Sequence, residues 1–334
     1  MTIKARFAQF TKNIRPTDKH IEEADRQTGY MIGRLKHRIS ADGTYELERI
    51  VLSGSNAKHT SLRKTDQNRF DVDLNACFSG KGATKEHLNK LLQFTRDQLV
   101  DIYRHLKDEK DFEVLRSAVR VKFTSGIKLW VDVAPIILDD SVLHVENAGW
   151  LPRPDGWRLT SVTGHNTFVS KRNKRSKEVS GPVHFNRLVR MFKWWNNLQG
   201  ELAQPSIFCE LVAAAAYEAT GVTDEWQSSL RQLFRFIRQH GFKTPILFTD
   251  YYDPAKVKLP YHAVIVMDSV NPENNITHTW SAGTRDEFLN GVQQAYNGMM
   301  DARSAEQDDD EDEAVDHWCR VFGDDFRSLS EEED

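Results

Sequence analysis

The stretch Phe70-Asp-Val-Asp-Leu-Asn-Ala-Cys-Phe78 decides the fold of this chain. Polar and apolar residues alternate along it. Because strand side chains repeat every two residues, Asp71 and Asp73 share one face while Val72 and Leu74 share the other. On a helix the two carboxylates would diverge. Carboxylates are depleted in strands, so this pair predicts a strand whose polar face serves a site.

A hairpin is predicted further along the chain. Two alternating runs, residues 119–124 and 127–133, flank Ser125-Gly126, which is the pattern of a β-hairpin with a two-residue turn. Asp132 lies on the second strand, on the face opposite its apolar neighbours. Pro135 is expected to end the pairing soon afterwards, because proline has no backbone N–H to donate. A third strand carboxylate is therefore predicted.

Another strand is predicted at residues 45–52, and it ends at a small turn that contains Gly54 and Ser55. Such a turn lets backbone N–H groups approach phosphates. Three carboxylates can hold two Mg²⁺ or Mn²⁺ ions, and a metal pair activates an attacking hydroxyl and stabilises a leaving pyrophosphate. Each piece alone is common in proteins, but their order resembles the signature of the DNA polymerase beta-like nucleotidyltransferases. We therefore predict phosphoryl or nucleotidyl transfer.

The remaining predicted elements are mostly helices. Helical spacing of apolar residues indicates six of them, with Thr84 as the N-cap of one and a capping box of Thr284 and Glu287 opening another. Two short strands are predicted in the second half of the chain, at residues 245–248 and 263–267. The predicted helices span residues 17–39, 84–106, 184–198, 205–220, 224–240 and 284–303.

A domain transition is placed in residues 149–182, which contain prolines and glycines and are expected to be irregular. Their basic run, residues 171–177, is compatible with binding a second nucleotide's phosphates, with binding nucleic acid, or with a solvated loop. The expected domains are a nucleotidyltransferase core with an N-terminal helix (1–165), a helical lobe (180–303) and an acidic tail (304–334).

Charge is distributed unevenly along the chain. Residues 301–334 hold 15 of the 49 acidic residues and three of the 45 Lys and Arg residues, so residues 1–300 carry a net charge of +8. A basic body suits a protein that handles nucleotides or nucleic acid. We expect the tail to be disordered, with a small amphipathic anchor at Trp318, Phe322 and Phe326. A sharper hypothesis is that the tail folds over the basic cleft and moderates access.

The composition is that of a globular protein. Hydrophobic residues make up 39% and charged residues 28%, which excludes a wholly disordered or collagen-like chain. No stretch approaches eighteen apolar residues and no leader-like pattern opens the sequence, so we expect no membrane span, no secretory signal and a cytoplasmic location. Cys77, Cys209 and Cys319 are far apart and form no CxxC pair, which argues against a disulfide framework and a structural zinc site.

Six stretches of the chain resemble the CD-NTase family, the bacterial relatives of cyclic GMP-AMP synthase and oligoadenylate synthetase. They follow family order, and the last three lie in a helical half that most other polymerase beta-like enzymes lack. The resemblance implies an α+β fold: a polymerase beta-like core with a mixed sheet and flanking helices, fused to a helical C-terminal lobe across a central cleft. The stretches are SGSNAKHTSLR (53–63), FDVDL (70–74), LWVDVAPII (129–137), FNRLVRMFKWWNN (185–197), PSIFCELVAAAAYE (205–218) and VMDSVNPENNIT (266–277).

The resemblance implies three catalytic metal ligands. Asp71, Asp73 and Asp132 would hold two Mg²⁺ or Mn²⁺ ions, with Asp132 nearest the acceptor hydroxyl. The ions would align an acceptor ribose hydroxyl with the α-phosphate of a bound NTP, and pyrophosphate would leave.

Four further residues are implied to bind nucleotide. Gly54 and Ser55 would contact the donor phosphates, and Lys193 and Ser206 would hold the triphosphate from the helical lobe. A lysine on an amphipathic helix is ordinarily exposed, and a serine beside a proline at a helix start is an ordinary cap. Only the resemblance gives Lys193 and Ser206 this role.

The chain also departs from the family pattern. His59 occupies a place where the family commonly has glycine, and no tyrosine follows Ser206. Trp194 and Trp195 are interpreted as packing residues and not as a platform for a base. Residues 274–275, both asparagine, fit a family-typical loop and an ordinary β-turn equally well.

By this resemblance the chain makes a cyclic di- or trinucleotide second messenger from NTPs, in anti-phage defence of the CBASS type, and a separate effector responds to the product. ATP and GTP are the expected substrates, with pyrimidine nucleotides open. No membrane partner is expected, and a nucleic-acid partner is left open. Two alternatives remain: a template-independent nucleotidyltransferase that modifies RNA or protein ends, and a nucleic-acid-binding pseudo-enzyme, which the three aligned carboxylates disfavour.

Overall fold

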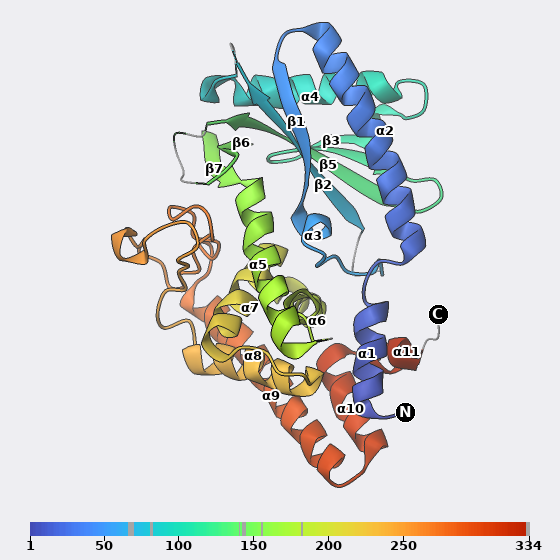
Figure 1. Ribbon diagram of the computed structural model, residues 1–334, viewed down its shortest axis with the longest axis vertical. Helices are drawn as coiled ribbons and strands as arrows, with labels where there is room; N and C mark the ends of the chain where they lie inside the picture. Colours follow the sequence, from blue (N-terminus) through green and yellow to red (C-terminus); the bar gives the residue numbers. More distant parts are fainter. Residues whose placement is uncertain are drawn as a thin grey trace. The chain divides into compact units, whose positions relative to one another are not determined.

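The computed structural model describes residues 1–65, 70–80, 83–139, 141, 145–154, 156–181 and 183–331. The chain divides into two compact units (Figure 1). The sheet unit consists of Pro16–His59 and Arg69–Thr167, and the helical unit of Met1–Arg15, Thr60–Asn68 and Phe168–Asp334. The sequence predicted a core at 1–165, a helical lobe at 180–303 and a tail at 304–334, whereas the segments 1–15 and 60–68 and the tail all group with the helical unit. Within the described residues, no helix has both the length and the apolar composition of a membrane span.

The sheet unit is built on a mixed sheet, as predicted. In the described part of the chain its strand order is β1-β2-β5-β4-β3, with β6 beside β5 and β7 beside β6. Strands β2 and β5 run parallel, and the other pairs run antiparallel. The strands are β1 (Glu46–Ser53), β2 (Asp71–Ser79), β3 (Phe112–Val114), β4 (Val119–Phe123), β5 (Leu129–Leu138), β6 (Ala148–Arg153) and β7 (Gly156–Ser161).

Two helices cover one face of this sheet. Apolar residues of α2 and α4, such as Leu35 and Leu91, share a core with the strand residues Val72 and Leu74. Because side chains alternate along a strand, the neighbouring carboxylates lie on the opposite face. The predicted cap Thr84 is separated from α4 by a turn of 3-10 helix. The helices of the unit are α2 (Asp18–Asp42), α3 (Gly54–Ala57) and α4 (Leu88–Tyr103), with 3-10 turns η1 (Lys85–His87) and η2 (Glu109–Asp111).

The hairpin of β4 and β5 is confirmed, but its predicted two-residue turn is wrong. Residues 124–128 form the connection, and the resulting register pairs Arg120 with Asp132. The pairing of the hairpin ends at Val133, shortly before Pro135 as predicted, while β5 itself continues to Leu138 beside β2. The proline lies between the part of β5 that pairs with β4 and the part that pairs with β6, where no N–H needs to be donated.

The prediction that residues 149–182 are irregular is wrong. Strands β6 and β7 form a hairpin, and α5 (Val162–Ser180) follows it. The glycines and prolines that suggested a loop are partly those of the hairpin connection. The basic run therefore lies on a helix, and Arg172 is buried, with its guanidinium 2.9 Å from Asp250 and 3.1 Å from Glu218. The solvated-loop interpretation of this run is thus wrong.

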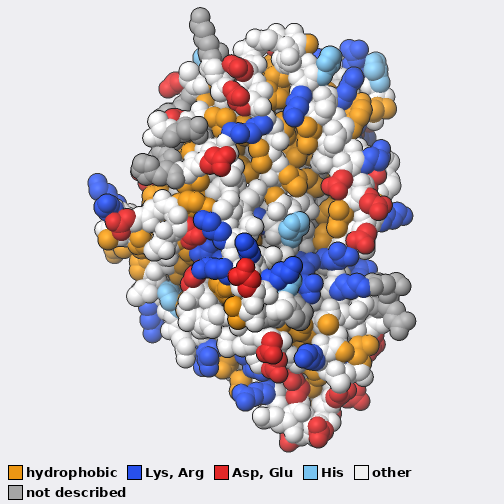
Figure 2. All heavy atoms as spheres, viewed as in Figure 1, with side chains coloured by type: hydrophobic (Ala, Val, Ile, Leu, Met, Phe, Trp, Pro, Cys, Tyr) orange, Lys and Arg blue, Asp and Glu red, His pale blue; other side chains and the backbone are white. Residues whose placement is uncertain are grey.

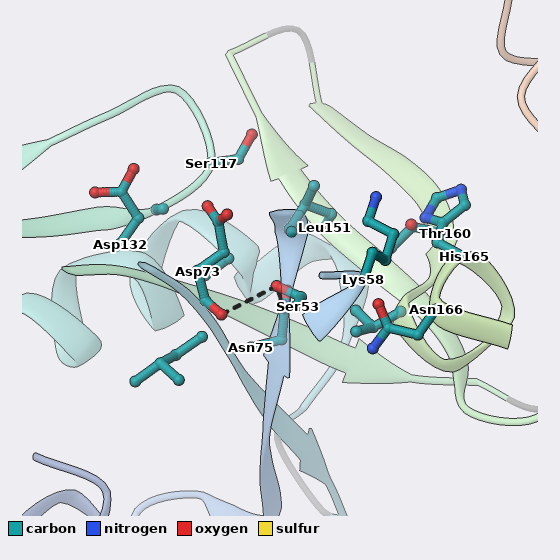
Figure 3. Close-up of a pocket in the computed structure, with 15 residues that line it drawn as sticks. Ser53, Lys58, Asp73, Asn75, Ser117, Asp132, Leu151, Thr160, His165 and Asn166 are labelled. Atoms are coloured by element: carbon teal, nitrogen blue, oxygen red, sulfur yellow. Dashed lines mark hydrogen bonds between the residues drawn. The ribbon is translucent and has the colours of Figure 1, made fainter. Parts of the chain in front are cut away.

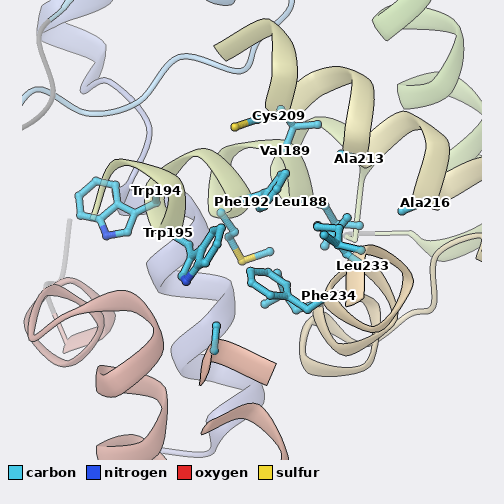
Figure 4. Packing of buried hydrophobic residues seen from close by; sticks show 14 of the residues in the cluster. Leu188, Val189, Phe192, Trp194, Trp195, Cys209, Ala213, Ala216, Leu233 and Phe234 are labelled. Atoms are coloured by element: carbon cyan, nitrogen blue, oxygen red, sulfur yellow. The ribbon is translucent and has the colours of Figure 1, made fainter. Parts of the chain in front are cut away.

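The helical unit packs its helices around an aromatic core. Trp194 and Trp195 are each 2% exposed, and Trp195 meets Phe234 edge-on with ring centroids 4.9 Å apart (Figure 4). This confirms that the two tryptophans are packing residues. In the described chain, the predicted strands 245–248 and 263–267 appear only as isolated bridges, Ile246 with Val266 and Met267 with Asn275. Helices of the unit are α1 (Ile3–Asn13), α6 (Phe185–Asn197), α7 (Ser206–Thr220), α8 (Trp226–His240), α9 (Ala282–Gln307), α10 (Glu311–Phe322) and α11 (Asp325–Glu331), with 3-10 turns η3 (Gly200–Leu202) and η4 (Pro254–Lys256).

Helix α9 begins earlier than the predicted capping box. Its N-cap is Ser281, whose hydroxyl accepts a hydrogen bond from the backbone N–H of Thr284 at 3.0 Å. Thr284 therefore lies inside the first turn and does not cap the helix. A serine three residues upstream offered the same local chemistry, and the apolar period alone did not distinguish the two starts.

The prediction of a disordered acidic tail is wrong, because α10 and α11 are ordered helices within it. Trp318, Phe322 and Phe326 are buried, and they pack against Phe7 and Phe10 of α1. The predicted amphipathic anchor is confirmed. Asp and Glu side chains gather on the surface where α9 gives way to α10 (Figure 2). Held by this packing, the tail is a structural part of the helical unit.

Candidate functional site

The pairing of β2 with β5 places the predicted carboxylates on neighbouring strands. Asp73 lies directly beside Asp132, and Asp71 lies beside Trp130. Asp73 and Asp132 line a pocket of about 300 Å³ in the sheet unit, and their carboxylates point to the same side (Figure 3). Asp71 is two residues earlier on the same strand face. The structure therefore brings the three predicted ligands onto one face, two of them in the same pocket.

The predicted phosphate-binding turn is attached to the strand that carries these carboxylates. Helix α3 begins at Gly54, directly after β1. The Ser53 hydroxyl donates to the Asp73 carbonyl at 3.3 Å, and the Asn56 amide donates to the Asp71 carbonyl at 2.7 Å. The Asn75 amide in turn donates to the Ser53 hydroxyl. These bonds hold the turn against β2.

Gly54 is required by both its backbone and its surroundings. Its φ is 64°, in the left-handed region that favours glycine. A Cβ at this position would overlap Oδ2 of Asp73 and lie 2.7 Å from its Cγ. The turn and the carboxylate therefore approach each other as closely as they do only because residue 54 has no side chain.

Sequence reasoning missed Arg120. Its Nε and one terminal nitrogen each donate to a carboxylate oxygen of Asp132 at 2.8 Å, and its guanidinium lies 4.2 Å from the centre of the Trp130 ring. The hydrogen bond that Arg120 donates to Asp132 raises the pKa of Arg120 further above its usual value. Bidentate pairing fixes the orientation of the Asp132 side chain. The predicted hairpin contained both residues, but its two-residue turn shifted the predicted pairing by one residue, so Asp132 was not placed opposite Arg120.

Other polar residues of the pocket were also missed, because several belong to the segment that was predicted to be irregular. One of them ties α5 to β1, since the Asn166 amide donates to the Leu52 carbonyl at 3.2 Å. Lys58 adds a positive charge to the lining. The further polar residues that line the pocket are Ser117, Thr160 and His165.

The donor set fits a hard divalent cation. Asp71, Asp73 and Asp132 offer carboxylate oxygens, the ligands that Mg²⁺ and Mn²⁺ prefer, and Gly54 leaves room beside one of them. In the described part of the chain, no three or more His, Cys, Asp or Glu side chains are already arranged around a metal position. Asp132 is paired with Arg120 instead. A cation at this site would therefore share Asp132 with Arg120.

The two predicted residues of the helical unit have different surroundings. Lys193 on α6 is 4% exposed, and its ammonium donates to the Thr60 carbonyl at 3.0 Å and lies 3.9 Å from Glu210. Ser206 is the first residue of α7 and is exposed. Lys193 is thus a buried, internally bonded lysine, whereas Ser206 stands at an open helix N-terminus.

The two asparagines of the 266–277 stretch are structural. The Asn274 amide donates to Asp268 at 2.9 Å, and Asn275 accepts from the Val266 N–H at 3.0 Å. Both asparagines are buried. Of the two interpretations left open by the sequence, the turn is the one that these contacts support.

The basic run of α5 lines a second pocket, of about 630 Å³, within the helical unit. Lys171, Lys174 and Arg175 contribute to it, but so do the carboxylates of Glu218 and Asp250. Nucleic-acid grooves present uniform positive charge to the phosphate backbone. The mixed charge of this pocket does not favour such a partner.

The chain is similar to proteins of known activity. Residues 1–173 match the profile of the Second Messenger Oligonucleotide or Dinucleotide Synthetase domain. The chain is 30% identical over 316 residues to the CBASS oligonucleotide cyclase CdnC of Escherichia coli strain KTE188, covering 93% of each protein. It is 26% identical over 330 residues to the cyclic AMP-AMP-AMP synthase of Escherichia coli strain MS 115-1, covering 97% of this chain and 96% of that one. The solved structure of E. coli MS115-1 CdnC with ATP shares the fold, with a TM-score of 0.81 at 23% identity over 98% of this chain and 99% of that chain.

Proposed function

Since this chain belongs to the CD-NTase family and is a nucleotidyltransferase that makes a cyclic nucleotide second messenger, we propose that it joins ATP into a cyclic trinucleotide. Two relatives that align with 97% and 99% of the chain are named cyclic AMP-AMP-AMP synthases. The relative that is 30% identical is a CBASS oligonucleotide cyclase. We accordingly propose a role in CBASS defence, with a separate effector that responds to the product.

One observation carries the proposed chemistry: Asp73 and Asp132 lie side by side in the sheet, with Gly54 against Asp73. We assign Asp71, Asp73 and Asp132 as the residues that hold Mg²⁺ or Mn²⁺. Two such ions, when bound, activate the acceptor hydroxyl and neutralise the charge that develops on the leaving pyrophosphate.

The Gly54–Ser55 turn binds the donor phosphates in this proposal. Its backbone N–H groups and the Ser55 hydroxyl supply hydrogen-bond donors without a large side chain in the way. The bonds that Ser53 and Asn56 make to the β2 backbone keep these donors in place before the substrate arrives. Donors fixed in advance need no reorganisation during the reaction, which is how such groups lower a barrier. Lys58 adds positive charge on the same pocket wall.

Arg120 acts on the reaction through Asp132. Its bidentate bond holds the carboxylate in one rotamer, so the oxygens that would meet the cation are already oriented. The carboxylate has about four lone-pair positions, so a cation can engage Asp132 beside the guanidinium. Arg120 is therefore a positioning residue whose contact with Asp132 tunes how tightly the cation is held.

Ser206 and Lys193 remain the proposed phosphate contacts of the helical unit. Ser206 begins α7, and the free N–H groups of a helix N-terminus favour an anion. Lys193 would bind a phosphate only through ammonium N–H groups that do not donate to Thr60.

The test is a product assay with labelled ATP, GTP, CTP and UTP, singly and mixed, with Mg²⁺ or Mn²⁺. The double variant Asp71→Ala/Asp73→Ala serves as the inactive control, and Asp97→Ala on the exposed side of α4 as the matched control that keeps activity. We expect a phosphatase-resistant product from ATP alone, and a mass that corresponds to three adenylates. A product that requires another base would overturn the assignment of ATP, and no carboxylate-dependent product from any mixture would overturn the proposed chemistry.

A further inference from the structure

A buried polar cluster in the helical unit holds the chain directly after the Gly54–Ser55 turn. Its centre is Thr60, which is 0% exposed. The Thr60 hydroxyl donates to Glu210 of α7 at 3.0 Å, and the Thr60 carbonyl accepts from the Lys193 ammonium of α6 at 3.0 Å. The hydroxyl oxygen also accepts from the same ammonium, at 3.4 Å. The hydroxyl and the carbonyl of one threonine are thus bound to two different helices.

The partners of Thr60 are themselves buried charges. Lys193 is 4% exposed and Glu210 3% exposed, and the charged atoms lie 3.9 Å apart. At that distance the direct ion pair is long, so Thr60 completes the hydrogen bonding between the two groups. The site is closed to solvent, and burial raises the pKa of the adjacent Cys209 thiol to about 12. Buried charges are retained only where such partners satisfy them.

The chain on the far side of Thr60 is fixed as well. Leu62 belongs to the apolar core of the helical unit, and the Arg63 N–H donates to the Ile14 carbonyl at 2.6 Å. On the near side, His59 adopts the left-handed conformation with φ of 54°, and its N–H donates to the Asn56 carbonyl at 3.1 Å. Thr60 is the residue at which the chain leaving the turn enters the helical unit.

We propose that Thr60, Lys193 and Glu210 are positioning residues for nucleotidyl transfer: they fix the chain that leaves the Gly54–Ser55 turn, so that the turn keeps the geometry that donor phosphates need. This inference rests on the proposed function, in which that turn binds the donor phosphates. In this inference, the ammonium of Lys193 binds Thr60 where a lysine on an amphipathic helix would ordinarily face solvent. The inference also gives roles to Thr60 and Glu210, which neither the motifs nor the pocket lining had singled out.

The test compares substitutions at Thr60 that differ in one group. Thr60→Val keeps the shape and removes the hydroxyl, and Thr60→Ser keeps the hydroxyl and removes a methyl group. Thr277→Val is the matched control, because Thr277 is equally buried in the helical unit and donates to the Val264 carbonyl at 3.0 Å, remote in sequence from the turn. The KM for ATP, kcat and the midpoint of thermal unfolding are measured for each variant with Mg²⁺.

We expect Thr60→Val to raise the KM for ATP about tenfold with a smaller change in kcat, because a loosened turn weakens phosphate binding in the ground state and the transition state alike. Thr60→Ser restores the wild-type KM. Thr277→Val lowers the unfolding midpoint by a similar amount and leaves the KM unchanged. If Thr60→Val and Thr277→Val have the same KM, the three residues only stabilise the fold and the inference is wrong.

Two further measurements separate this inference from the proposed function. If the wild type forms no product, the dissociation constant for Mg·ATP, measured by isothermal titration calorimetry, replaces KM: weaker binding by Thr60→Val but not by Thr60→Ser supports the inference, and equal binding overturns it. If Thr60→Val does not fold, Glu210→Gln is used, because it keeps an acceptor for the Thr60 hydroxyl and removes the charge that faces Lys193. Unchanged KM or Mg·ATP binding in a folded Glu210→Gln protein contradicts the inference.

Discussion

Replacing Gly54 with alanine tests the link between the phosphate-binding turn and the carboxylates. The new Cβ would overlap Oδ2 of Asp73 and approach Cγ to 2.7 Å, a separation at which something must move. The backbone of the turn is bonded to β2, so the side chain of Asp73 is the part that yields. The substitution therefore displaces a predicted metal ligand without removing any of its atoms.

The expected costs follow from two separate terms. An alanine at a φ of 64° is strained by about 1–2 kcal/mol, which the lower entropy of the unfolded chain offsets by roughly 0.4–1 kcal/mol. Forcing Asp73 off its rotamer adds about 0.5–1.5 kcal/mol. The protein should thus lose roughly 2 kcal/mol of unfolding free energy. A ligand displaced by about 1 Å costs on the order of 100-fold in rate, so activity should fall far more than stability.

Gly126→Ala is the matched control for this experiment. Its φ of 68° imposes the same backbone strain, and no atom lies within 4 Å of the position that its Cβ would take. Thermal unfolding and product formation from ATP are measured for both variants. We expect both to unfold a few degrees below the wild type and only Gly54→Ala to lose activity. Equal activity in the two variants would refute the reasoning, because it would mean that Asp73 tolerates displacement or has no part in the reaction.

Four other predictions concern stability. Arg190 is 8% exposed and has no hydrogen-bonded or ionic partner within the described chain, and burial beside two other arginines lowers its pKa to about 10. Arg190→Met should therefore raise the free energy of unfolding, measured with urea, by about 1–3 kcal/mol. A lower free energy of unfolding in this variant would contradict the prediction. His59→Gly removes the backbone strain of a histidine in the left-handed region. It should raise the free energy of unfolding by about 1 kcal/mol, seen as a higher midpoint of thermal unfolding. Trp318→Ala should cost about 3–5 kcal/mol, whereas Trp157→Ala, at a site 45% exposed, should cost under about 1 kcal/mol; equal costs would mean that the tail packing contributes nothing. Burial lowers the pKa of His240. As the pH falls below about 6.5, the unfolded chain therefore takes up a proton before the folded chain does, and the free energy of unfolding falls. His240→Gln should make the free energy of unfolding less dependent on pH, as measured by unfolding curves between about pH 5 and 7.

The strand carboxylates were predictable because their signal is local. Asp71 and Asp73 share a face by the two-residue period of a strand, and that holds for any strand that contains them. Which strand lies beside them depends on parts of the chain far away in the sequence. The pairing of Asp73 with Asp132 depends on the parallel register of β2 and β5. It also depends on the path of the connection between these strands, residues 80–128, which no local pattern encodes. The resemblance supplied that pairing, and the residues alone did not.

Arg120 shows how a small local error hides a functional contact. The pattern around Ser125-Gly126 predicted a two-residue turn, and the real connection is longer. A shift of one residue in a hairpin exchanges every cross-strand partner, so a correct prediction of both strands still missed the residue that binds Asp132. Turn length is set by the twist and packing of the whole sheet, which neighbouring residues do not report.

The tail and α5 were misjudged for a related reason. Charge and weak periodicity describe what a segment would do alone in water. The aromatic residues of α10 and α11 are ordered by contacts with Phe7 and Phe10, more than three hundred residues earlier in the chain. The anchor could be identified because its apolar residues repeat with helical spacing, but the partner that orders it could not. An acidic segment is therefore disordered only if no such partner exists elsewhere in the sequence.

The burial of Lys193 is the feature that the neighbouring sequence predicts least well, and it depends on the conformation of His59. A lysine on an amphipathic helix is ordinarily exposed, yet Lys193 is buried because Thr60 and Glu210 provide oxygens for its ammonium. Thr60 can meet it only if the chain turns sharply just before, and that turn requires a left-handed residue at position 59. At this position the chain adopts the left-handed conformation with a histidine and bears the strain. A strained residue that persists beside a buried polar cluster indicates that the cluster, and not the intrinsic preference of the backbone, determines the path of the chain out of the Gly54–Ser55 turn.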